Sequence, residues 1–417
     1  MTAVASPTTT SQAGPAPSGV RRSLAAEWLA HPKASYYLVL VPVLLLTGLG
    51  LVMVLSASGV DAYTRYDGDA FYYFIRQGIF AVIGLVCMAV MSRLRRGGIQ
   101  VAGWGLLMGG MVLQLLVLVG HGWEKNGNTN WLDLGAGLPR VQPSELLKFA
   151  LVCWAACVFA NKVKVLGEPR HVVVPFVPVS AVLILMIALC NDLGTAVVVG
   201  GIMLAILLVV GAHWKIIASI SAVAVVGAAT LIAVSPNRMG RIFGFADQTS
   251  DTLGANHQPI KAEFAMASGG WWGTGLGSSK QKWGGLVEAH TDYMLAIIGE
   301  ELGLVCILAV LALFLVLGYA GFRIAMRNTE PLYRFLAAGV TCWLMIEALA
   351  NILVVLRMLP VFGVPLPFLS YGGSALISNM LGIGVLLACA KQEPGALADP
   401  TPRRRLLRTI FPIRAAS

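Results

Sequence analysis

The sequence predicts an all-α, polytopic membrane protein with ten transmembrane helices and a large outer loop between the seventh and the eighth. Of its 417 residues, 57% are hydrophobic, and the mean hydropathy is +0.77, values far above those of soluble globular domains. Ten apolar stretches are long enough to cross a bilayer as helices. Because these stretches are continuously apolar rather than alternating, they are not barrel strands.

The expected spans form one membrane domain, residues 34–392. The tail before it, residues 1–33, is polar and rich in Pro and Ala and is expected to be disordered, and a basic tail, residues 393–417, follows the domain. The seven cysteines fall in or at the ends of apolar spans, so no disulfide framework or zinc pattern is expected. In order, the spans cover residues 36–55, 76–94, 99–119, 144–160, 172–189, 194–210, 216–234, 293–318, 335–356 and 369–390.

The charge of the short loops predicts the orientation of the chain. Residues 93–96 and 323–334 are strongly basic, whereas residues 58–74 carry three aspartates and one arginine. Because basic loops stay in the cytoplasm, both termini are expected there and the loop after the seventh span on the outer side. The net charge of +10 then reflects topology and attraction to anionic lipid, and nucleic acid is not an expected partner.

Residues 235–291 form the one long connection, and a loop of this length is usually functional. A short amphipathic helix is expected within residues 258–270, followed by three tryptophans that suit a membrane interface. Residues 273–277 read GTGLG, but they lack the residue order and the preceding strand of a phosphate-binding loop. Nucleotide binding is therefore not expected.

Acids concentrate where this loop re-enters the membrane, since Val287–Gly303 carries four carboxylates. At the junction, either Thr291 or Asp292 could cap the eighth span, and a functional role for Asp292 is the alternative. Glu300 and Glu301 point to different sides of the helix. At least one of them is expected to pair with another helix, because an unpaired carboxylate in lipid is costly.

Two further polar sets lie at the ends of spans. Glu145 and Lys148 share one helix face at i, i+3, after Pro143 at the expected start of the fourth span. They form either an ion pair that lowers the cost of insertion or a polar patch that faces an outward-open cavity. Residues 358–377 contain three prolines, which prevent a regular helix, and then a Ser-Tyr-Gly-Gly-Ser run that opens the tenth span.

Four motifs, in this order on ten spans, closely resemble those of the SEDS family of bacterial cell-wall polymerases: VQPSELLKFA (141–150), DLGTA (192–196), EAHTDYMLAIIGEELG (288–303) and PLPFLSYGGSALI (365–377). The resemblance covers essentially the whole membrane domain. Within the family, the chain looks more like the division member than the elongation member. The resemblance therefore implies a multi-pass protein of the bacterial cytoplasmic membrane that acts at the division septum.

The resemblance implies a peptidoglycan glycosyltransferase that polymerises lipid II, with donor and acceptor both attached to undecaprenyl diphosphate. The family's essential aspartate falls on Asp292, which is implied to be the base that deprotonates the acceptor hydroxyl. A diphosphate leaves without a protonating acid, so one carboxylate suffices, whereas glycosidases normally use two. The alternatives are a lipid II flippase, which the intramembrane charges permit, and a non-catalytic division scaffold. No cofactor is evident, and a divalent cation, Mg²⁺ or Mn²⁺, is compatible with this chemistry.

The resemblance also implies a set of substrate-binding residues and no metal ligands. Within this set, Lys148 is a candidate for pairing with a diphosphate or with an acid, and outside it Asp192 is expected to cap the sixth span. The chain departs from the family in four places, with Asn130 for an arginine, Cys190-Asn191 for the usual Gln-Pro before DLGTA, Glu347 for a glutamine and Arg357 for a glycine. Arg357 is expected either to replace the missing arginine or to extend to lipid headgroups. The expected substrate-binding residues are Trp131, Glu145, Lys148, Lys282, Glu288, His290, Thr291, Arg357 and Ser370.

The implied partners are lipid II, the undecaprenyl-diphosphate-linked glycan, a class B penicillin-binding protein and other membrane proteins of the divisome. The penicillin-binding protein would supply the transpeptidase that crosslinks the strands. Its single transmembrane helix is expected to dock on the outer half of the eighth and ninth spans.

Overall fold

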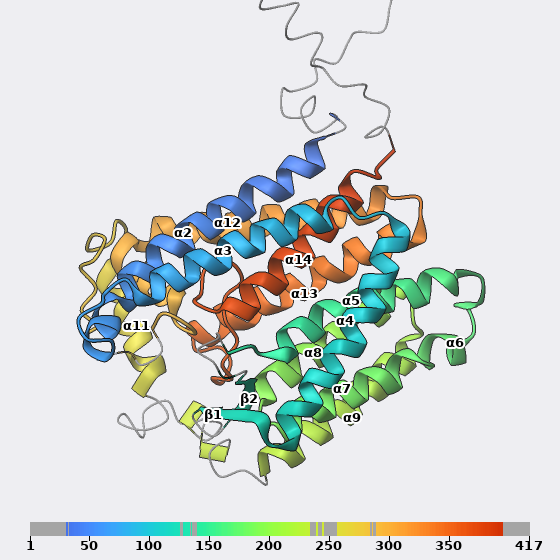
Figure 1. Cartoon of the computed structure of the whole chain (residues 1–417), viewed down its shortest axis with the longest axis horizontal. Helices are drawn as coiled ribbons and strands as arrows, with labels where there is room; N and C mark the ends of the chain where they lie inside the picture. Colours follow the sequence, from blue (N-terminus) through green and yellow to red (C-terminus); the bar gives the residue numbers. More distant parts are fainter. Residues whose placement is uncertain are drawn as a thin grey trace, which may run out of the picture.

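The computed structural model of the chain is a bundle of long helices (Figure 1). It describes residues 31, 33–125, 128–133, 135, 140–233, 239–240, 244–245, 257–283, 286 and 289–394. Within these ranges, ten helices are long and apolar enough to cross a membrane, which confirms the number predicted from hydropathy.

Elements are labelled as in Figure 1. The first three spans are α2 (Ala34–Arg65), α3 (Tyr72–Met91) and α4 (Arg96–Leu116), which the π-helical turn η1 (Val117–His121) extends. The middle four are α5 (Pro143–Asn161), α6 with α7 (Pro169–Val173 and Phe176–Leu189), α8 (Leu193–Val210) and α9 (Trp214–Ala233). The last three are α12 (Met294–Arg327), α13 (Pro331–Val355) and α14 (Gly373–Ala390). The shorter elements are β1 (Gly122–Lys125), β2 (Asn128–Leu132), η2 (Val163–Val165) and α11 (His257–Gly269).

Burial falls from the centre of the bundle to its edge. In their most apolar windows, 83% of the residues of α5 and of α14 are buried, against 0% in α9. Central helices approach closely where one of them carries glycine: a Cβ on Gly84 of α3 would lie 2.9 Å from the Met380 side chain of α14. The polar motifs on α5 and before α14 therefore lie on helices that are enclosed by the rest of the bundle.

The bundle has two ends, here called the terminal end and the loop end. At the terminal end, α2 begins and α14 finishes (Figure 1). Lys391 donates there to the Ser92 carbonyl at 2.8 Å, and Arg327 pairs with Glu393 at 3.1 Å. The loop end holds the β1–β2 hairpin, α11 and the segment 357–372 between α13 and α14.

The β1–β2 hairpin is the one departure from the all-helical prediction among the described residues. Its strands are antiparallel, with Trp123 opposite Trp131. An Asn-Gly dipeptide, the strongest short-range signal for a hairpin, stands between the two strands in the sequence. The hairpin is tied to the start of α8, because Thr129 donates to the Cys190 carbonyl at 3.0 Å.

The longest of the described spans, α12, is broken at Gly303, whose φ of 77° is a left-handed value that glycine adopts without strain. The loop after α11 inserts at this break. The N–H groups of residues 274–275 donate to the carbonyls of residues 300–301, and those of residues 304–305 donate to the carbonyls of residues 270–271, over 2.9–3.3 Å. The segment 270–275, which includes the start of GTGLG, therefore satisfies the backbone groups that the break releases.

Candidate active site

Asp292 lies at the loop end, two residues before the first residue of α12, and is half-buried. Its backbone carbonyl accepts a hydrogen bond from the Asn351 side chain at 2.9 Å, and the same amide donates to the Val364 carbonyl at 2.8 Å. A Cβ on Gly363 would lie 3.6 Å from Asp292 Oδ2. Asp292 thus lies between α13, which holds its backbone, and the proline-rich segment 357–372, which its carboxylate approaches and which is non-helical as predicted.

His290 lies in a junction of three chain segments. Its carbonyl accepts from the Tyr371 N–H at 2.8 Å, and its ring lies 4.9 Å from that of Tyr73 and 5.6 Å from that of Tyr371. The Ser370 carbonyl accepts from the Gln77 side chain of α3 at 3.2 Å. The segment that contains Ser370 and Tyr371 is therefore held against the segment that contains His290 and Asp292.

Glu145 and Lys148 of α5 form an ion pair, one of the two expected arrangements, at 2.8 Å, and Lys148 also pairs with Glu347 of α13. The Trp343 indole donates to the same Glu347 oxygen at 2.8 Å. All three charged residues are at most 2% exposed. The pairing of Lys148 with acids, one of the two roles left open by the sequence, is thus the one observed.

The β1–β2 hairpin carries Trp131 and Asn130. The Asn130 side chain donates to Asp192 at 2.8 Å, and Gln142 donates to the same oxygen at 3.1 Å. Asp192 also accepts from the Thr195 N–H at 3.0 Å, which confirms that it caps the sixth span, α8. Trp131 is half-buried, so part of its ring remains accessible at the loop end.

After the hairpin, Asp133 accepts hydrogen bonds from the Gly135 N–H at 2.9 Å and from Arg140 at 3.2 Å. The Gly135 N–H, assisted by Arg140, holds the pKa of Asp133 below its usual value. Arg140 also stacks over the Trp123 ring, 3.6 Å from its centroid. Its guanidinium is therefore already used to order the hairpin.

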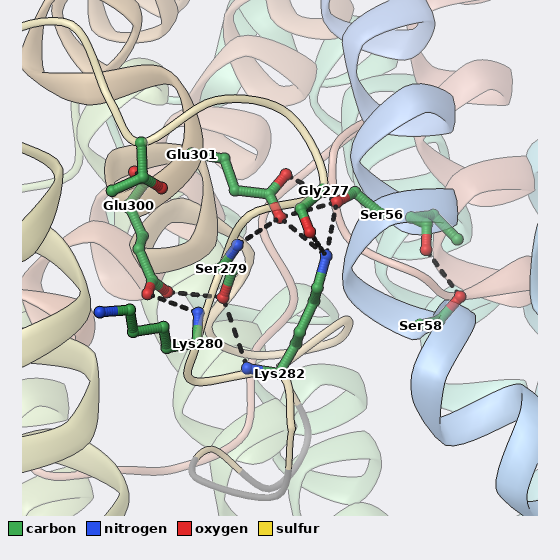
Figure 2. Close-up of polar contacts among 10 residues, drawn as sticks. Ser56, Ser58, Gly277, Ser279, Lys280, Lys282, Glu300 and Glu301 are labelled. Atoms are coloured by element: carbon green, nitrogen blue, oxygen red, sulfur yellow. Dashed lines mark hydrogen bonds and ion pairs between the residues drawn. The ribbon is translucent and has the colours of Figure 1, made fainter.

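Figure 2 shows the surroundings of Lys282, which lie against α12. Lys282 Nζ pairs with Glu301 at 3.2 Å and donates to the Gly277 carbonyl at 2.6 Å. Ser56 of α2 donates to both Glu301 oxygens, at 2.6 and 2.7 Å. Glu301 therefore pairs with another helix as predicted, and the Lys282 ammonium is engaged within the protein.

Glu300 points into the loop after α11 (Figure 2). Its carboxylate accepts from the Ser279 hydroxyl at 2.6 Å and from the Lys280 N–H at 2.8 Å. Glu300 is 1% exposed and Glu301 0%. The adjacent carboxylates thus both bind residues 279–282 of one loop, including Ser279, and they hold it on α12.

Arg357 lies at the end of α13 and pairs with Glu263 of α11 at 2.7 Å. Its φ of 55° is left-handed, a region that favours glycine. One expectation from the sequence is that Arg357 replaces the family arginine that is missing at Asn130. The two side chains bind different carboxylates, since Arg357 pairs with Glu263 and Asn130 donates to Asp192. Of the remaining predicted residues, Thr291 adjoins Asp292, and Glu288 lies outside the described residues.

The model of the cell cycle protein family that covers FtsW, RodA and SpoVE matches residues 36–394. The chain belongs to this family. The four motifs of the sequence are thus confirmed as those of the SEDS family, to which these proteins belong. A Mycobacterium tuberculosis relative named probable peptidoglycan glycosyltransferase FtsW is 36% identical over 394 residues, which are 92% of this chain and 74% of the relative.

Solved structures share the fold. A crystal structure of Thermus thermophilus RodA aligns with a TM-score of 0.60 at 25% identity, covering 88% of this chain and 99% of RodA. A chain from the structure described as "Structural coordination of polymerization and crosslinking by a peptidoglycan synthase complex" aligns with a TM-score of 0.65 at 24% identity. It covers 85% of this chain and 96% of its own length. The ten-span bundle is therefore a SEDS fold.

Several residues that organise this SEDS site were not singled out from the sequence. Gln77, Asn351 and Tyr73 tie α3, α13 and the segments before α12 and α14 together. Polar side chains within apolar spans are costly unless they are partnered, so Gln77 and Asn351 could have been found by that rule. Among the described residues, no group of three or more His, Cys, Asp or Glu side chains is placed to hold a metal ion.

Proposed function

We propose that this peptidoglycan glycosyltransferase of the SEDS family polymerises lipid II at the outer face of the bacterial cytoplasmic membrane during septal wall synthesis. The observation that carries the proposal is the half-buried Asp292 at the loop end, in contact with α13 and facing the segment 357–372. The basic loops support an outward-facing loop end with both termini in the cytoplasm. The name of the M. tuberculosis relative supports the role in division.

In the proposed reaction, Asp292 accepts the proton of the acceptor's 4-hydroxyl while that oxygen attacks the anomeric carbon of the donor sugar. The bond from this carbon to the diphosphate breaks on the opposite face, so the new linkage is inverted to β. The electron pair of that bond leaves with the lipid diphosphate, which needs no protonation. Asp292 then returns its proton to water.

A general base works only if it is held within a fraction of an ångström of its productive position. Asn351 fixes the carbonyl of Asp292, and His290 is fixed two residues earlier by Tyr73 and Tyr371. Since α3, α13 and the segment 357–372 supply these contacts, the proposed base is positioned by parts of the bundle outside its own loop.

Replacement of Asp292 by asparagine tests the proposal. Purified Asp292→Asn protein in detergent should lose polymer formation from lipid II by at least about 100-fold, the usual contribution of a general base, and keep its affinity for lipid II. Asp67→Asn is the matched control, because Asp67 is exposed and has a left-handed φ of 48° that asparagine also adopts. Substantial polymer from Asp292→Asn rejects the assignment. The wild type in detergent separates an enzyme from a flippase. Detergent leaves no two compartments between which lipid II could be moved, so polymer formed there requires an enzyme.

We further propose that the partner is a class B penicillin-binding protein that docks on the outer half of α12 and α13. The likeness to a chain from a structure described as a peptidoglycan synthase complex supports this partner class. Coupling to a crosslinking enzyme also fits the chemistry, because uncrosslinked glycan strands do not form a wall.

A further inference from the structure

The cations expected to bind substrate are all paired with acids. Lys148 is enclosed by two carboxylates, Lys282 is paired with Glu301, and Arg357 with Glu263. A diphosphate would have to displace a carboxylate from each of them. The charge that a leaving diphosphate develops must therefore be stabilised from elsewhere.

Arg76 of α3 is a different kind of cation. It is half-buried, and its guanidinium carbon lies 4.8 Å from the centroid of the Tyr72 ring. Tyr72 in turn stacks on Tyr66, with 3.6 Å between centroids. Among the described residues no carboxylate forms an ion pair with Arg76. Aromatic rings, rather than an acid, hold this guanidinium.

The position of Arg76 places it beside the candidate active site. Burial raises the pKa of the Tyr371 hydroxyl, and the nearby positive charge of Arg76 opposes this shift. The Tyr371 ring lies 5.6 Å from that of His290, two residues before Asp292. Gln77, next to Arg76, fixes this geometry through the Ser370 carbonyl at 3.2 Å and the Gly372 N–H at 3.3 Å.

We propose that Arg76 binds the diphosphate of a lipid-linked sugar substrate next to Asp292. The inference rests on the proposed function and deepens it by assigning the cation. A guanidinium suits this role, because its planar fork binds two phosphate oxygens at once and cannot lose its charge. Arg76 is in the second turn of α3 at the loop end, which is where a lipid diphosphate meets the bilayer surface.

Binding of undecaprenyl diphosphate and of undecaprenyl monophosphate to the full-length protein tests the proposal, in nanodiscs of phosphatidylcholine. Arg76→Gln should weaken diphosphate binding by about tenfold or more, the loss expected for charge-assisted hydrogen bonds, and should reduce the preference for diphosphate over monophosphate. Arg76→Lys keeps the charge but not the fork, so it should fall between the two. Arg65→Gln is the matched control, because Arg65 is exposed at the loop end and paired with Asp61 at 2.8 Å.

Equal affinity of the wild type and Arg76→Gln for the diphosphate overturns the inference. If Arg76→Gln does not fold, an unchanged preference in Arg76→Lys overturns it instead. Nanodiscs with phosphatidylglycerol test a phospholipid headgroup as the occupant. The inference is also overturned if phosphatidylglycerol competes with the diphosphate in the wild type but not in Arg76→Gln, while the two proteins bind the diphosphate equally in phosphatidylcholine. That result would assign Arg76 to the phospholipid headgroup. Diphosphate binding is also measured in Asp292→Asn with and without Arg76→Gln. Polymer formation by Asp292→Asn would reject the catalytic proposal, whereas unchanged diphosphate binding on loss of Arg76 would reject this one, so the two failures are distinguishable.

Discussion

Replacing Glu301 by leucine should weaken the attachment of the loop after α11 to α12. Glu301 is 0% exposed and the Lys282 side chain 6%, so the variant strands a buried ammonium (Figure 2). Removing one partner of a buried ion pair costs about 3–5 kcal/mol. Lys282 keeps the Gly277 carbonyl at 2.6 Å, whereas the Ser56 hydroxyl and the Ser279 N–H lose their acceptor. We therefore expect a loss of about 3 kcal/mol, the lower end of the range for a buried pair.

Equilibrium unfolding in detergent, followed by tryptophan fluorescence, measures this loss. The double variant Glu301→Leu/Lys282→Met removes both charges and should recover most of the stability, so the mutant cycle isolates the pair. Glu263→Leu provides the control, because Glu263 also pairs with a cation, Arg357, but is 60% exposed, and such a pair is worth about 1 kcal/mol or less. If Glu301→Leu costs no more than Glu263→Leu, the buried pair does not anchor the loop.

Three further predictions concern the base, the orientation and the partner. Asn351→Leu removes two hydrogen bonds, worth about 1 kcal/mol each. Because this releases the backbone of Asp292, the variant should lose more of its polymerisation rate than of its affinity for lipid II. Equal losses in rate and affinity would contradict this. In a variant without the natural cysteines, a cysteine within residues 247–254, which lie outside the described residues, should react with a membrane-impermeant thiol reagent in intact cells. One at Arg327 should not, and equal labelling would overturn the orientation. A class B penicillin-binding protein should co-purify with the chain and stimulate glycan synthesis, and unchanged synthesis with no complex would count against the docking proposal.

Hydropathy predicts the number of spans because each span needs an apolar stretch long enough to cross the bilayer. It does not predict how far a helix continues beyond the apolar stretch. The first span was expected to end at residue 55, but α2 continues to Arg65. Similarly, α12 runs nine residues past the expected residue 318. The break at Gly303 was not predicted, because a glycine in an apolar run is common and only the inserted loop reveals why it is needed.

The local part of the site could be read from the sequence, and the long-range part could not. The i, i+3 spacing of Glu145 and Lys148 predicts that they share a helix face, and their ion pair was one of the two arrangements expected from it. Glu347, the third member, is 199 residues from Lys148, a pairing that no local pattern contains. The same holds for Asn351 and Asp292, which are 59 residues apart.

The distribution of buried charge favours a fixed catalytic site over alternating access. Lys148 joins α5 to α13, and Glu301 joins α2, α12 and the loop after α11. A transporter that opened between these helices would have to break buried pairs, at a cost of about 3–5 kcal/mol for each charge left alone. Transporter sites also lie near the midplane, whereas Asp292 lies at the loop end before α12 begins. The buried acids therefore tie the helices of the bundle together, and the proposed general base, Asp292, is half-buried at the edge of this frame.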